Sequence, residues 1–109
     1  MTTINFEGRV AVITGAGGGL GRAHALLLAS RGARVVVNDL GGSLTGTGGS
    51  ATAAQRVMQE IQALGGQAIA NGDDIATPEG AQRLIEAAIQ AFGRVDILIN
   101  NAGIQHVAR

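Results

Sequence analysis

Short, nearly continuous apolar runs alternate along the chain with longer segments in which apolar residues recur every three or four positions. The four runs lie at residues 10–13, 35–37, 68–70 and 95–99. Continuous runs of this length are typical of strands that are covered on both faces of a parallel sheet. Three segments with helical spacing separate them, at residues 20–31, 54–64 and 78–92. The pattern predicts the order β-α-β-α-β-α-β.

The third helical segment has the clearest ends. Thr77 is a typical N-cap, Pro78 suits the first helical position, and Gly93 follows the last apolar residue of the stripe. Strands that alternate with helices imply right-handed crossovers and a parallel α/β sheet. If the chain reverses its direction of winding before the fourth strand, the strand order is 3-2-1-4 in a three-layer sandwich. A ligand crevice then opens between strands 1 and 4, at their carboxyl ends.

Composition narrows the classes of function. The 109 residues fit one small domain, and eight basic residues balance eight acidic ones, so no charge excess points to nucleic acid or anionic lipid. There is no cysteine, and all eight basic residues are arginine, so lysine is absent, as is tyrosine. No apolar stretch is long enough to span a membrane, and no signal peptide is recognisable, so a soluble, cytoplasmic protein is expected. His24 and His106 lack a second histidine at ligand spacing, and no metal site is expected.

A glycine-rich segment follows the first predicted strand and opens the first predicted helix. It reads T-G-x-x-x-G-x-G, with Gly15, Gly19 and Gly21 at the spaced positions after Thr14. Glycines there allow tight turns and let a pyrophosphate approach helix N–H groups. A bare turn would also use glycine, but the strand-to-helix setting favours nucleotide binding. A P-loop is excluded because its lysine is missing.

Acidic and amide side chains follow the other three predicted strands. Asp39 comes eighteen residues after Gly21, where a carboxylate can accept hydrogen bonds from both ribose hydroxyls and repel a 2′-phosphate. NAD is therefore expected over NADP, although Asp39 could instead start a turn. For Asp73 and Asp74, an adenine contact and a solvated turn remain equal alternatives. Asn side chains at 100–101 can tie neighbouring strand ends together through bonds to the backbone, and the small Ala102 and Gly103 allow close approach of a ligand.

Taken together, these motifs resemble the cofactor-binding half of the short-chain dehydrogenase/reductase family. The resemblance extends to about His106 and implies a Rossmann-type fold that is incomplete, cut after its fourth strand, over residues 1–109. It implies NAD-binding roles for ten residues: Gly15, Gly19, Leu20 and Gly21 at the pyrophosphate, Asp39 at the adenosine ribose, Asp74 and Ile75 at the adenine, and Asn101, Ala102 and Gly103 beside the nicotinamide ribose. Within the family, residues 35–42 and the glycine-rich stretch after them are similar to the (3R)-hydroxyacyl-CoA dehydrogenase units of type 2 multifunctional enzymes.

The catalytic residues of that family do not occur in this sequence. Family members use Ser, Tyr and Lys, with Tyr-x-x-x-Lys supplying the proton donor, and this chain contains neither Tyr nor Lys. Acid–base help of this kind is worth about 10²–10⁴-fold. We therefore assign no catalytic residue and expect the 109 residues alone not to turn over. The parent enzyme would transfer hydride between NAD and a secondary alcohol or ketone, including a 3-hydroxyacyl-CoA.

Two other functions remain open at this stage. An S-adenosylmethionine methyltransferase also needs a glycine-rich turn after strand 1 and a carboxylate after strand 2, as Gly15 to Gly19 and Asp39 provide. A non-enzymatic nucleotide-binding module is the other. In that case the predicted strand at 95–99 would be an uncovered edge, and we expect self-association into a homo-oligomer.

Overall fold

The structure is a computed structural model that describes residues 5–40 and 52–101. The elements predicted from the apolar pattern are confirmed in number and order. They are β1 (Val10–Thr14), α1 (Gly19–Ser30), β2 (Arg34–Asn38), α2 (Ala53–Ala63), β3 (Gln67–Asn71), α3 (Pro78–Phe92) and β4 (Ile97–Asn100).

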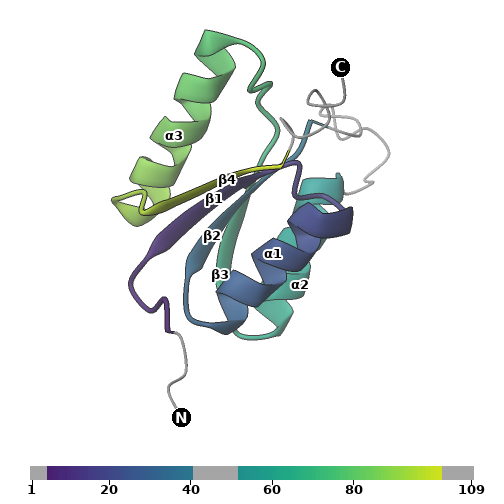
Figure 1. Ribbon diagram of the computed structural model, residues 1–109, viewed down its shortest axis with the longest axis vertical. Coiled ribbons are helices and arrows are strands. Elements are labelled where there is room, and N and C mark those ends of the chain that lie inside the picture. Colours follow the sequence, from purple (N-terminus) through teal and green to yellow (C-terminus); the bar gives the residue numbers. More distant parts are fainter. Residues whose placement is uncertain (1–4, 41–51, 102–109) are drawn as a thin grey trace.

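The four strands form one parallel sheet in the order β3-β2-β1-β4, as predicted (Figure 1). β1 lies at the centre, where Ala11 is in register with Val35 of β2 on one side and with Ile97 of β4 on the other. The chain thus winds in one direction from β1 to β3 and then crosses back to β4. This reversal places the carboxyl ends of β1 and β4 side by side.

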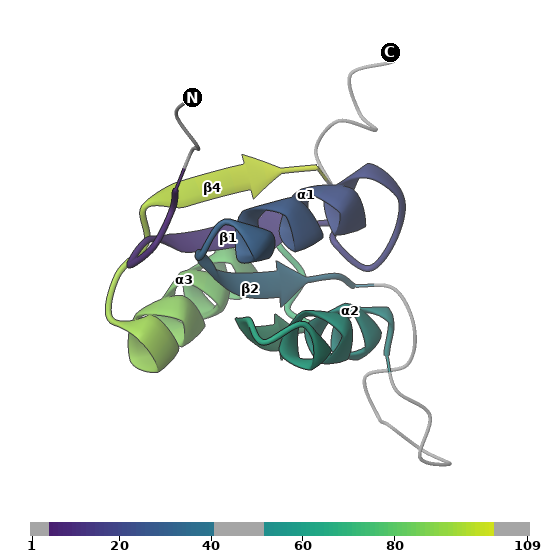
Figure 2. The ribbon, with the colours of Figure 1, turned by 90° about the horizontal axis from the view of Figure 1, so that it is seen from below.

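Helices cover both faces of the sheet. α1 and α2 lie together on one face and α3 on the other (Figures 1 and 2). Successive strand residues point to opposite faces, so Ala11 and Ile13 pack under α1 and α2, while Val12 packs under α3. All three are fully buried. This two-sided burial explains why the strands read as continuous apolar runs and confirms the three-layer α/β architecture.

The ends of α3 are those that the sequence predicts. The Thr77 side chain accepts a hydrogen bond from the Gly80 N–H at 2.9 Å, and Pro78 occupies the first helical position. Gly93 ends the helix at a φ of +86°, a left-handed conformation that glycine adopts without strain. Each of these end signals depends on contacts between residues that are close in the sequence. The ends of α3 can therefore be predicted without knowledge of the tertiary structure.

β4 is shorter than predicted, because it begins at Ile97 and not at residue 95. The Asp96 carboxylate accepts the Val10 N–H at 2.8 Å, in the place of a backbone carbonyl, while the Asp96 N–H donates to the Val10 carbonyl at 2.9 Å. Val95 packs instead against the core beneath α3. Within the described sheet β4 is an edge strand with Leu98 59% exposed, and the self-association expected from such an edge stays a prediction.

Asp96 is expected to make stability depend on pH. Hydrogen bonds from Arg94 and from the Val10 N–H lower the pKa of this carboxyl. A lowered pKa contributes stability that is complete above the unfolded value of about 4 and is lost as the pH falls through the folded value. Asp96→Asn keeps the shape and an acceptor, so it should unfold at lower urea concentration than the parent at pH 7, with the two midpoints converging below about pH 4.

The exposed Glu86 on α3 provides the matched control for this experiment. Glu86→Gln removes a carboxylate that does not join β1 to β4. Urea midpoints measured from pH 3 to pH 7 should separate Asp96→Asn from this control. A midpoint difference between Asp96→Asn and the parent that stays constant over the whole range would show that the charge of Asp96 contributes nothing.

Candidate functional site

The carboxyl ends of all four strands meet at one edge of the sheet (Figure 1). The segment 15–18 follows β1, Asp39 follows β2, residues 72–76 follow β3, and Asn101 follows β4. The structure therefore brings together the segments that the sequence singled out. Ala102 and Gly103 of the predicted set lie outside the described residues, as does His106.

The glycine-rich segment forms a turn that leads directly into α1. Gly15 and Gly19 have φ values of +62° and +55°, which side chains disfavour. Gly21 is buried in the first turn of α1, where a Cβ atom would overlap the carbonyl oxygen of Gly15. The N-cap residue, Gly18, makes no side-chain capping hydrogen bond. The result is a cradle whose helix N–H groups no side-chain cap covers, and such an end of a helix favours an anion.

Asp39 is tied to this cradle. The Gly17 N–H donates to Asp39 Oδ2 at 2.7 Å, and the carboxylate is half-buried. A Cβ atom on Gly17 would lie 2.5 Å from that oxygen and 2.6 Å from the Cβ of Ala53, at the start of α2. Three segments distant in sequence therefore meet at Gly17, and the Asp39 carboxylate lies beside the glycine cradle.

The segment after β3 is organised by its own polar groups. Asp74 Oδ1 accepts the Ala76 N–H at 2.9 Å, which is the turn that the sequence left as one alternative. The Asp74 carbonyl accepts a hydrogen bond from the Thr77 hydroxyl at 3.0 Å, and Ile75 is half-buried against the core beneath α3. Asp73 accepts from Arg83 Nε at 2.9 Å, and hydrogen bonds from Arg83 and Asn71 lower the pKa of Asp73. An adenine contact of Asp74 stays a prediction.

The end of β4 is joined to the end of β1. The Thr14 hydroxyl donates to Asn100 Oδ1 at 2.8 Å, so an Asn side chain does tie neighbouring strand ends, although it bonds to a side chain and not to the backbone as expected. The next residue, Asn101, has a buried Nδ2 with no hydrogen-bond partner among the described residues. A buried donor without a partner costs free energy, so a ligand oxygen that accepted a hydrogen bond from Asn101 Nδ2 would remove this cost.

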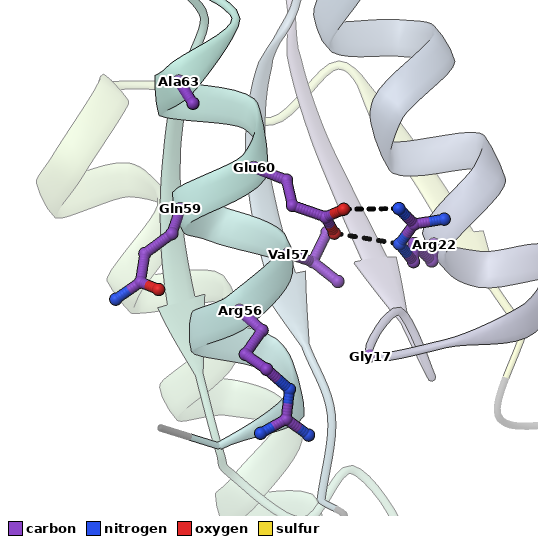
Figure 3. A pocket seen from close by; sticks show the side chains of 7 residues that line it. All are labelled: Gly17, Arg22, Arg56, Val57, Gln59, Glu60 and Ala63. Atoms are coloured by element: carbon purple, nitrogen blue, oxygen red, sulfur yellow. Dashed lines mark hydrogen bonds and ion pairs between the residues drawn. The ribbon is translucent and has the colours of Figure 1, made fainter. Parts of the chain in front are cut away.

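A shallow groove of about 520 Å³ lies beside the cradle, between α1 and α2 (Figure 3). Arg22 of α1 and Glu60 of α2 form a bidentate ion pair across the groove, with two hydrogen bonds that are drawn as dashed lines. Hydrogen bonding to Arg22 lowers the pKa of Glu60, although both side chains are about two-fifths exposed. Ion pairs as exposed as this one contribute little to stability, because solvent and salt screen the two charges. Sequence reasoning missed this pair because only the packing of α1 on α2 brings the two residues together.

Other kinds of site find no support in the part of the chain that the structure describes. Among residues 5–40 and 52–101, no group of three or more His, Asp or Glu side chains could hold a metal ion. No helix described there is long and apolar enough to cross a membrane. The glycine cradle, the carboxylate beside it and the orphaned Asn101 donor together fit a dinucleotide.

Comparison with known proteins points in the same direction. The family model described as "short chain dehydrogenase" matches residues 9–109. A curated relative, "Peroxisomal multifunctional enzyme type 2" of Drosophila melanogaster, is 58% identical over 101 residues, which are 93% of this chain and 16% of the relative. The "Peroxisomal multifunctional enzyme A" of Dictyostelium discoideum is 54% identical over 93% of this chain and 22% of its own length.

Solved structures share the fold. A short chain dehydrogenase from Mycobacterium avium superposes with a TM-score of 0.82 at 53% identity, over 90% of this chain and 35% of that one. A 7α-hydroxysteroid dehydrogenase complexed with NADH and 7-oxo-glycochenodeoxycholic acid gives a TM-score of 0.74 at 41% identity, over 86% of this chain and 33% of that one. The chain thus spans about a third or less of the length of each of these four relatives.

Proposed function

Because the chain belongs to the short-chain dehydrogenase family, we propose that residues 1–109 are the cofactor-binding half of an oxidoreductase that uses NAD. The observation that carries the proposal is the glycine cradle at the start of α1 with the Asp39 carboxylate fastened to it through Gly17. One solved relative is a complex with NADH, which supports the choice of cofactor. The family match favours NAD over S-adenosylmethionine, so the methyltransferase hypothesis is set aside.

In this proposal each predicted site residue keeps the role that the family resemblance implies. The pyrophosphate lies on the N–H groups of the cradle, formed by Gly15, Gly19, Leu20 and Gly21. The adenosine ribose bonds to Asp39, the adenine lies against the segment with Asp74 and Ile75, and the nicotinamide ribose lies beside Asn101, Ala102 and Gly103. When bound, the cofactor would supply hydride transfer, with NAD⁺ as the acceptor and NADH as the donor, and these residues would hold it in place.

We further propose that the substrate is a secondary alcohol or ketone of the 3-hydroxyacyl-CoA class. Two relatives with more than half of their aligned residues identical are named as multifunctional enzymes, and a third is named "hydratase-dehydrogenase-epimerase". The sequence contains neither Tyr nor Lys, so in this proposal the Tyr and Lys that the family resemblance implies for proton transfer are not among these 109 residues. All three names say peroxisomal, so they lend no support to the cytoplasmic location expected from the sequence.

Asp39 is expected to select NAD over NADP. A 2′-phosphate adds up to two negative charges, and Asp39 would place a carboxylate beside them. Asp39→Asn keeps the size of the side chain and removes its charge. Calorimetric titration of the full-length protein should show Kd for NAD rising about 10–100-fold, because hydrogen bonds to a charged acceptor are the stronger kind. Kd for NADP should fall, because the repulsion of the 2′-phosphate is removed, so the preference for NAD falls.

The control for this titration is Glu7→Gln, which removes an exposed carboxylate just before the amino end of β1, opposite the cradle. Its Kd for NAD should equal that of the parent. If the parent protein itself shows no heat of binding with NAD and no thermal stabilisation by it, the proposed function is wrong. If NAD binds but Asp39→Asn leaves both affinities unchanged, the cofactor is right and the role of Asp39 is wrong.

A further inference from the structure

Asn38, the last residue of β2, is a buried polar residue that directly follows three valines. The three residues before it, Val35 to Val37, are fully buried, and Asn38 is only 2% exposed. Burying an amide costs free energy unless its groups are hydrogen-bonded. A valine at this position would carry no desolvation cost. The hydrogen bonds of the Asn38 amide therefore have to offset the free energy that its burial costs.

Both N–H groups of the side chain can be assigned to acceptors of a neighbouring segment. Asn38 Nδ2 donates to Asn71 Oδ1 at 2.8 Å and to the Asp73 carbonyl at 3.0 Å. The backbone of the same residue reaches the other way, since its carbonyl accepts the Ala16 N–H of the cradle at 2.9 Å. One residue therefore connects the segment after β1 with the segment after β3, and it directly precedes Asp39.

The contacts continue outward from the partners of Asn38. The Asp39 N–H donates to the Asn71 carbonyl at 3.1 Å, and the Asn71 side chain donates to Asp73 Oδ2 at 2.9 Å. Arg83 of α3 holds the other oxygen of the Asp73 carboxylate. The three segments that the proposed function places around adenosine are thus fastened to one another at the level of the strand ends, before any ligand arrives.

We propose that Asn38 is a positioning residue that pre-organises the adenosine half of the cofactor site. This inference rests on the proposed function, because it concerns the same crevice. Asn38 touches no reacting atom in this proposal. It sets the distance between the cradle, Asp39 and the Asp73–Asp74 segment, so a ligand that bridges them binds without first ordering them.

Asn38→Leu tests the proposal, because it keeps the branched shape of the side chain and removes both donors. In the full-length protein, Kd should rise about 10–100-fold for NAD and to a similar degree for AMP, which carries only the adenosine half. With a 3-hydroxyacyl-CoA as substrate, KM for NAD should rise while kcat at saturating NAD stays within about twofold, as expected when an effect is confined to binding. Asn38→Ser, which restores one short donor, should recover part of the affinity.

Val35→Ala is the matched control, since it removes buried volume from the amino end of the same strand. It should lower the melting temperature and leave Kd for NAD and AMP unchanged. Equal affinities in Asn38→Leu and the parent, or equal losses in Asn38→Leu and Val35→Ala, overturn the inference. Should Asn38→Leu fail to fold, the same comparison is made with Asn38→Ser. Failure of the parent to bind NAD would instead overturn the proposed function, so the two failures are distinguishable.

Discussion

Gly21→Ala is expected to destabilise the protein by about 3 kcal/mol or more and to abolish NAD binding. The added Cβ would overlap the carbonyl oxygen of Gly15 and lie 2.9 Å from the Cα of Ala16. These are backbone atoms, so no side chain can rotate away to make room. The helix would have to move off the turn, and the movement would open the cradle in which the pyrophosphate is proposed to lie.

Gly18→Ala provides the control within the same turn. Apart from the chain neighbours of Gly18, no atom of residues 5–40 and 52–101 lies within 4 Å of a Cβ built on it, and its φ of −172° is an extended conformation that any residue adopts. Thermal unfolding should therefore leave Gly18→Ala close to the parent and Gly21→Ala far below it, and calorimetry with NAD should rank the affinities in the same order. Equal melting temperatures for the two variants would show that the close approach of α1 to the turn is not needed.

The sequence predicts the fold well because local rules and tertiary structure agree in this chain. The fully buried run around Val36 reads as a strand because helices cover both faces of the sheet, and such a run needs no alternation. Thr77 and Gly93 mark the ends of α3 through contacts with their own neighbours. The strand order needed one further assumption, that the chain reverses its direction of winding before the fourth strand, and the structure confirms that order.

The polar contacts of the site were beyond prediction because they join residues that the sequence keeps apart. Asn38 and Asn71 are 33 positions apart, and their bond depends on the register of β2 with β3. β4 begins at Ile97 and not at residue 95, and just before it the Asp96 side chain, and not its backbone, accepts the Val10 N–H. Periodicity locates the elements, whereas which side chain binds which depends on how the elements are placed against one another.

Gly80→Ala is expected to destabilise the protein, although alanine normally stabilises a helix over glycine by about 0.5–1 kcal/mol. Gly80 lies in the first turn of α3, where a Cβ would overlap the carbonyl oxygen of Asp74 and lie 2.8 Å from Thr77 Oγ1. That carbonyl already accepts from the Thr77 N–H at 3.2 Å and from its hydroxyl at 3.0 Å, so it can retreat only by losing both bonds. Overpacking of about 1–3 kcal/mol plus about 1 kcal/mol for each lost bond outweighs the gain in propensity.

The net loss should be about 2–4 kcal/mol, with NAD affinity lowered as well, because the displaced segment carries Asp73 and Asp74. Gln82→Ala introduces the same residue at an exposed position of the same helix and should leave stability within about 0.5 kcal/mol of the parent. Urea unfolding measures both variants, and titration with AMP reports the adenosine side alone. If Gly80→Ala raised the unfolding midpoint, helix propensity, and not the contact with the Asp74 carbonyl, would determine the effect of this substitution on stability.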